Sequence, residues 1–201
     1  MVAATTVRVR HSSTPLRSGA IWVLGALAFA AAMFPFQTRR PLADGMFYIG
    51  TMHSLYVDGD VDLRDEADFY PWVKYYTLSG TPPPNGLRNP FPIGTSLWWL
   101  PFYVAFDGLD RVMGGTGVGD ATGPRAGPAY FATSFWIFIG LGVLACALGR
   151  LGFNRRERFA VPLVLIALSP LPAYVTFAPD MSHGVSFAMA AILLFAYSIC
   201  T

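Results

Sequence analysis

Long stretches without a charged residue are the feature that most constrains how this chain can fold. Residues 19–36, 128–149, 159–178 and 184–201 contain no Asp, Glu, Lys or Arg. As helices, runs of this length are long enough, or nearly so, to cross the hydrocarbon core of a bilayer. The whole chain is 54% hydrophobic and 13% charged, with a mean hydropathy of +0.45, which is unusual for a soluble domain. The sequence therefore predicts an all-α, polytopic transmembrane protein.

The distribution of arginines predicts how these spans are oriented. Residues 1–18 and 150–158 are rich in arginine, and such segments usually stay in the cytoplasm. Residues 91–106 contain two prolines and two tryptophans, which favours an interfacial or re-entrant segment over a crossing helix. The predicted organisation is cytoplasmic 1–18, span 19–36, external loop 37–127, span 128–149, cytoplasmic 150–158, span 159–178, external turn 179–183 and span 184–201.

Two alternatives to this topology remain open from the sequence. A crossing helix at 91–106 would place the acidic loop inside and the basic N-terminus outside, an arrangement favoured by Arg39 and Arg40. Residues 19–36 could also be a cleaved signal peptide, although this apolar run exceeds the usual length of such segments. Cys146 and Cys200 both lie inside apolar runs, so no disulfide framework is indicated.

The segment 37–90 combines acidic and aromatic residues. It holds seven of the twelve acidic residues of the chain, and its net charge is −2. Because it also contains many large apolar side chains, we expect a folded, membrane-facing element with short interfacial helices. Apolar spacing predicts an amphipathic helix over 43–57, with Asp44 near its start. Asp44 could therefore simply be a helix N-cap, a role that does not exclude catalysis.

The next acidic stretch, DGDVDLRDEAD at 58–68, has the alternation of a calcium loop. It fails the EF-hand pattern, because Leu63 stands at position six and Phe69 at position twelve. A different divalent metal site built from Asp60, Asp65 or Glu66 is one interpretation, and an exposed turn is the simpler one. The histidines His53 and His183 are single candidates that no metal-binding spacing supports.

Several functional classes are disfavoured by what the sequence lacks. It contains no phosphate-binding loop, dinucleotide fingerprint, nucleophile elbow, HExxH motif or paired CxxC motif. Outside the arginine-rich loops it shows no basic, aromatic-interleaved surface, so a nucleic-acid partner is not expected. What remains is a function at the membrane.

The order of four segments, ADGMFYI, VDGDVDLRDE, NPFPIGTSLWWLPFY and APDMSHGVSFAMA, resembles the polytopic C-type membrane glycosyltransferases. These include protein O-mannosyltransferase-like and aminoarabinose-transferase-like enzymes. The resemblance implies sugar transfer from a polyprenyl-phosphate donor to a glycan, lipid or protein acceptor. It also implies a bacterial inner-membrane location with the active loop periplasmic or extracellular.

The resemblance implies roles for several residues. Asp44 would be the catalytic base, and Asp65, Glu66 and His183 would bind a divalent metal ion or the acceptor. Arg39, Arg40 and Arg88 would neutralise the donor phosphate. Members of the class have more spans, so these residues are expected to form the N-terminal part of a larger enzyme, with the span 184–201 truncated. The alternative function is a non-catalytic membrane subunit or transporter portion that binds a partner or cation through its acidic loop; the uncharged spans argue against a transport pathway.

Overall fold

Every element in the described part of the chain is helical, as expected. The computed structural model describes residues 15–37, 41, 43–69, 89–117 and 125–200. Its elements are α1 (Pro15–Met33), the 3-10 helix η1 (Phe34–Phe36), α2 (Ala43–Val57), α3 (Glu66–Phe69), α5 (Gly94–Val112), α6 (Gly127–Arg150), α7 (Arg155–Leu168), α8 (Leu171–Thr176) and α9 (His183–Cys200).

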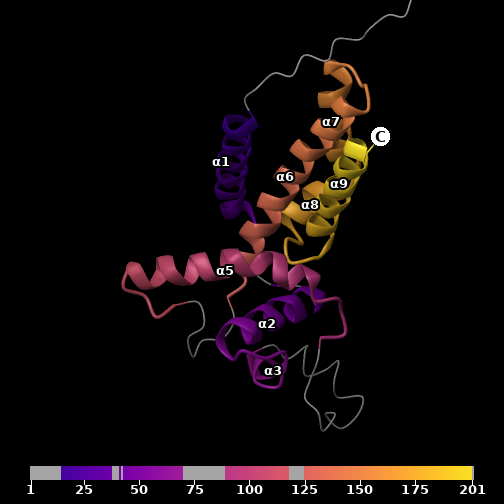
Figure 1. The fold of residues 1–201 in the computed structure, drawn as a ribbon. Coiled ribbons are helices and arrows are strands. Elements are labelled where there is room, and N and C mark those ends of the chain that lie inside the picture. Colours follow the sequence, from indigo (N-terminus) through magenta and orange to yellow (C-terminus); the bar gives the residue numbers. More distant parts are fainter. Residues whose placement is uncertain (1–14, 38–40, 42, 70–88, 118–124, 201) are drawn as a thin grey trace, which may run out of the picture.

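An apolar helical bundle forms one half of the molecule. In it α6 packs against α1 on one side and α9 on the other (Figure 1). At Gly140 of α6, an added Cβ would lie 2.9 Å from the backbone of Ala188 in α9, so the two helices approach too closely for a side chain. Among the described residues, α6 and α9 are both long and apolar enough to cross a membrane. A shorter apolar segment, Ala20–Phe36, accompanies them.

The apolar run 159–178 is divided between two helices, which differs from the single helix expected. α7 begins at Arg155, where Asn154 and Glu157 form a capping box, and it ends at Leu168. α8 then begins at Leu171, with Pro170 as its N-cap residue and Pro172 in its first turn. Proline cannot donate a helical hydrogen bond and restricts the residue before it, which explains the break.

A second layer of helices lies across one end of the bundle. α5 runs crosswise to α6 and α9, and α2 and α3 lie on its other side (Figure 1). Tyr48 of α2 packs edge-on against Trp99 of α5, and both side chains are buried. The Ser96 hydroxyl of α5 also donates to the Tyr48 carbonyl oxygen at 2.9 Å. We call α2, α3 and α5 the cross layer. α5 continues to Val112, beyond the expected limit of residue 106.

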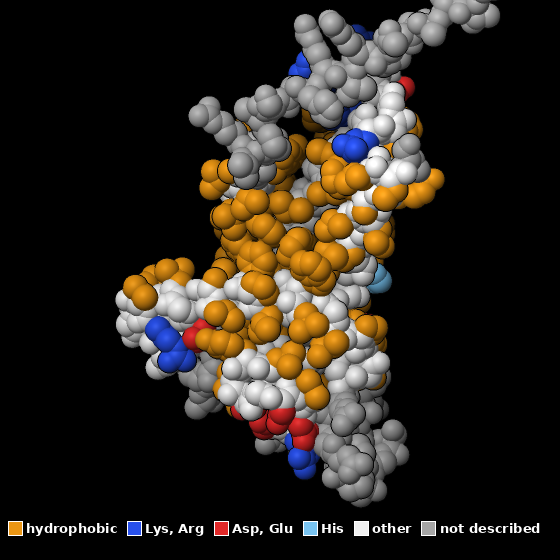
Figure 2. All heavy atoms as spheres, in the orientation of Figure 1, with side chains coloured by type: hydrophobic (Ala, Val, Ile, Leu, Met, Phe, Trp, Pro, Cys, Tyr) orange, Lys and Arg blue, Asp and Glu red, His pale blue; other side chains and the backbone are white. Residues whose placement is uncertain are grey.

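The two halves differ in their surfaces. Figure 2 shows a band of apolar side chains over the bundle, with acidic and basic side chains toward its two ends. Large apolar groups are exposed on the bundle helices, including Leu163 of α7 at 66% and Leu193 of α9 at 70%. Acidic side chains instead gather at the far side of the cross layer (Figure 2). The described surface is thus divided between an apolar bundle and a charged outer side of the cross layer.

Candidate functional site

Asp44 lies where the cross layer meets the bundle. α2 begins at Ala43, so Asp44 is the second residue of the helix and not the residue preceding it. A carboxylate in the first turn is favoured by the partial positive charge of the helix N-terminus. The Asp44 side chain is partly exposed, and could therefore meet a substrate. The bounds of α2 are those predicted for the 43–57 helix.

A second carboxylate, that of Asp180, packs against this helix start. Asp180 belongs to the turn between α8 and α9 and is fully buried. The adjacent Gly45 makes this contact, because an added Cβ there would overlap the Asp180 carboxylate. The structure therefore brings acidic residues from opposite ends of the chain to the junction of the cross layer and the bundle.

Side-chain hydrogen bonds fix α2 in place above α5. Asn89 donates from its amide nitrogen to the Thr51 hydroxyl at 2.9 Å. At the C-terminal end of α2, the Tyr56 hydroxyl donates to Asp107 at 2.8 Å, and Arg111 donates to the same carboxylate at 2.8 Å. The bond to Asp107 raises the pKa of Tyr56. Hydrogen bonds thus hold the middle and the C-terminal end of α2.

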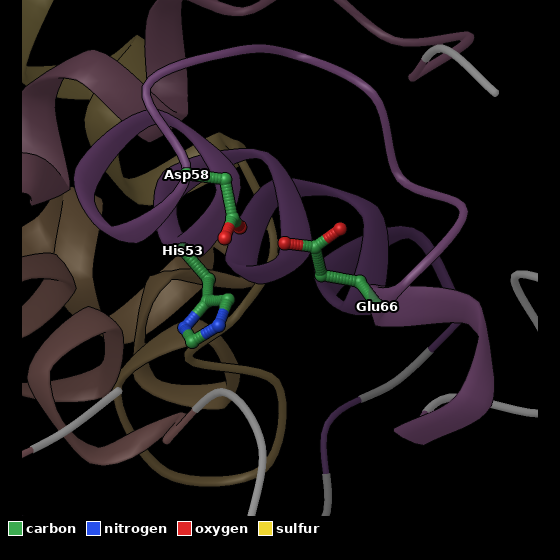
Figure 3. A group of neighbouring side chains, drawn as sticks. All are labelled: His53, Asp58 and Glu66. Carbon is green, nitrogen blue, oxygen red and sulfur yellow. The ribbon is translucent and has the colours of Figure 1, made fainter. Parts of the chain in front are cut away.

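A separate group of His53, Asp58 and Glu66 forms at the C-terminal end of α2. One potential ligand atom from each side chain lies within 4.8 Å of the others. Figure 3 shows the imidazole ring and the two carboxyl groups turned toward a common space. His53 belongs to α2, Asp58 to the turn after it, and Glu66 is the first residue of α3. A group of this composition could hold a metal ion.

Burial perturbs the acid–base properties of this group. It raises the pKa of Glu66 to about 9, and the neighbouring Asp65 carboxyl adds to the effect. Burial also raises the pKa of Asp58, while it lowers the pKa of His53 against the opposing effect of Asp58 and Asp65. His53 is therefore neutral at pH 7, the form in which imidazole binds metals.

The other residues proposed from the sequence have different surroundings. Asp65 is exposed, and Asp60 accepts hydrogen bonds from the Ser54 hydroxyl and the Asp62 backbone. His183 begins α9, is exposed and packs its ring against Tyr174, with centroids 4.8 Å apart. Among the described residues, neither Asp65 nor His183 joins the group of His53, Asp58 and Glu66. Arg39, Arg40 and Arg88 lie outside the described residues.

The sequence identified Glu66 as a candidate ligand and His53 as a single candidate, but it did not join them, and Asp58 was missed. The sequence did contain a signal for this group. The predicted helix 43–57 has His53 in its last turns and is followed directly by Asp58, which places the two side chains near the same helix end. Asp180 was also missed, although its turn was expected on the same side as Asp44. Asp180 is a single aspartate that follows a proline, and no feature of the sequence around it predicts its burial against Gly45.

Several cavities adjoin the bundle. One, of about 480 Å³, lies among α1, α6, α7 and α8 and has an almost wholly apolar lining that includes Phe29, Leu141 and Leu163. Another, of about 510 Å³, lies beside η1 and the start of α6, and Gln37, Arg125 and Tyr130 contribute to its lining. Arg125 also lies 3.6 Å from the Asp110 carboxylate.

In comparisons with protein-family models, curated proteins and solved structures, no match to this chain was found.

Proposed function

We propose that this chain transfers a sugar from a polyprenyl-phosphate donor to an acceptor hydroxyl at the outer face of a bacterial inner membrane, within a C-type glycosyltransferase. The observation that carries the proposal is the position of Asp44, a partly exposed carboxylate in the first turn of α2 at the junction of an apolar bundle and a polar layer. A lipid-linked donor has its reactive carbon at such a boundary.

The proposed sugar transfer requires one general base. Asp44 takes the proton of the acceptor hydroxyl as the acceptor oxygen bonds to the anomeric carbon. The bond between that carbon and the phosphate oxygen breaks, and polyprenyl phosphate leaves with the bonding electrons. Asp180 packs against the neighbouring Gly45, which supports a fixed position for the start of α2.

Both cavities are suited to the donor. The apolar cavity among α1, α6, α7 and α8 suits part of a polyprenyl chain, because its lining offers almost no polar surface. Arg125 lines the cavity beside η1. Its positive charge could help to neutralise the donor phosphate, together with the three arginines that the sequence suggested for this role. The acceptor is a glycan, lipid or protein.

We also propose a divalent metal ion as a cofactor held in the cross layer, apart from the transfer step itself. The same group of His53, Asp58 and Glu66 also favours the second candidate function, a non-catalytic membrane subunit that binds a cation through its acidic loop. The two functions differ in what they require of Asp44, because that residue does not belong to the metal-binding group.

The test is sugar transfer by the Asp44→Asn variant of the protein, expressed from its complete gene and assayed in membranes with a radiolabelled polyprenyl-phosphate sugar. We expect at least a hundredfold loss of transfer with unchanged expression. Asp62→Asn is the matched control, because this acidic residue of the same layer forms a surface ion pair with Arg64. Transfer by Asp44→Asn at the wild-type rate would contradict the role of Asp44 and favour the second function.

A further inference from the structure

The group of His53, Asp58 and Glu66 has a property that an ordinary acidic turn lacks. Glu66 is 1% exposed, and among the described residues no side-chain nitrogen or hydroxyl group donates to its carboxylate oxygens; the side chains beside it are the carboxyl groups of Asp58 and Asp65. Burying a carboxylate without hydrogen bonds costs several kcal/mol, so such a group either holds a proton or meets a cation. Its carboxyl group points toward His53 and Asp58 (Figure 3).

The His53 ring is oriented as a metal ligand would be. Its Nδ1 atom lies 2.9 Å from the hydroxyl of Tyr103, a residue that is fully buried in α5. A neutral imidazole that donates its Nδ1 proton to this hydroxyl leaves the lone pair of Nε2 for a ligand. Histidines that bind metals are commonly held through the second ring nitrogen in this way.

We propose that His53, Asp58 and Glu66 bind one divalent first-row transition-metal ion, with water completing its coordination. The ion fastens the turn after α2 to the start of α3. Bonds from such ions to nitrogen and oxygen are about 2.0–2.2 Å long, so side-chain movements on the order of 1 Å bring all three ligands into contact. This site does not depend on the proposed sugar transfer.

The ligand types select the class of ion. One imidazole with two carboxylates suits Zn²⁺ or Mn²⁺, whereas Ca²⁺ and Mg²⁺ prefer sites made wholly of oxygen atoms. The neighbouring acidic residues do not supply such an oxygen site, because Asp60 accepts from Ser54 and the Asp62 backbone, and Asp62 pairs with Arg64.

Binding can be measured with Mn²⁺ alone. The full chain, purified in detergent through a tag without histidines and treated with a chelator, is titrated with Mn²⁺ while electron paramagnetic resonance records the free ion. We expect one Mn²⁺ bound per chain, displaced by Zn²⁺ because Zn²⁺ binds nitrogen and oxygen sites more tightly. An unchanged signal of free Mn²⁺, or displacement by Ca²⁺ as effective as that by Zn²⁺, would overturn the proposal.

Single substitutions then test which residues bind the ion. His53→Gln and Glu66→Gln should each weaken Mn²⁺ binding at least tenfold, and Glu66→Gln keeps the shape of the side chain, so the fold is preserved. Asp62→Asn, which removes an acidic residue of the same loop from outside the group, should bind as the wild type does. Equal binding by all three variants, or equal loss in all three, would show that the ion binds elsewhere. Sugar transfer need not be measured, so failure here is distinct from failure of the proposed function.

Discussion

At the scale of single residues, Glu66 shows how a structure changes the meaning of an acidic sequence motif. Six acidic residues lie between 58 and 68, and in the sequence they are equivalent. In the structure Glu66 is the one described acidic side chain of this stretch that is fully buried, while Asp60 and Asp62 accept local hydrogen bonds. Burial therefore selects one carboxylate for a specific role.

The raised pKa of Glu66 predicts how stability depends on pH without metal. Its pKa rises from an ordinary value of 4.5 to about 9, so the folded state holds the proton more tightly than the unfolded state. The stabilising contribution is complete below about pH 4.5 and is lost as pH rises toward 9. In chelator, the wild-type melting temperature should fall relative to that of Glu66→Gln between these limits. A parallel pH dependence of the two proteins would contradict the burial of a titrating Glu66.

The residues of the candidate site were predictable to different degrees. Asp44 could be placed near a helix start because apolar spacing around it is local information. The contact between Asp180 and Gly45 joins segments that are far apart in the sequence, so no local sequence pattern predicts it. For the same reason His53 and Asp58 could not be assigned to Glu66, since their meeting depends on how the chain turns between α2 and α3.

At the scale of elements, α2 and α6 follow their sequence patterns closely, whereas α7 and α8 do not. α2 has the predicted bounds, and α6 covers the predicted 128–149 run with one residue more at each end. The absence of charged residues predicted 159–178 as a single span, interrupted by Pro162, Pro170 and Pro172 but not divided by them. The break between Leu168 and Leu171 is a local backbone effect within that apolar run.

The junction of α1, α6 and α8 depends on one buried amide. The Gln37 side-chain nitrogen lies 2.8 Å from Ser134 Oγ and 2.9 Å from the Val175 carbonyl oxygen. Val175 is in the last turn of α8, where carbonyl groups lack helical partners. Gln37→Leu leaves this acceptor unpaired and should destabilise the protein by about 1–3 kcal/mol.

Thermal unfolding in detergent measures this effect. Thr176→Val is a suitable control, because the Thr176 hydroxyl donates within α8, to the Pro172 carbonyl oxygen. The control should unfold near the wild-type temperature, and Gln37→Leu clearly below it. If Gln37→Leu were as stable as Thr176→Val, the amide would not join these helices.

At the scale of the whole molecule, the proposed function depends on which side of the membrane the cross layer faces. The apolar bundle and the cross layer are distinct in composition and position (Figures 1 and 2). The predicted topology rests on the distribution of arginines, which helix packing does not encode. The polar junction at Asp44 can receive a lipid-linked donor at the outer face only if the bundle spans the membrane with the cross layer outside.

Cysteine labelling in intact cells tests this arrangement most directly. Cys146 and Cys200 are first replaced by serine, and single cysteines are then placed at two exposed positions, Val61 beside the acidic turn and Phe153 between α6 and α7. A thiol reagent that does not cross the membrane should label Val61→Cys in intact cells and Phe153→Cys only after the cells are opened. Labelling of Phe153→Cys from outside, with Val61→Cys protected, would contradict the account.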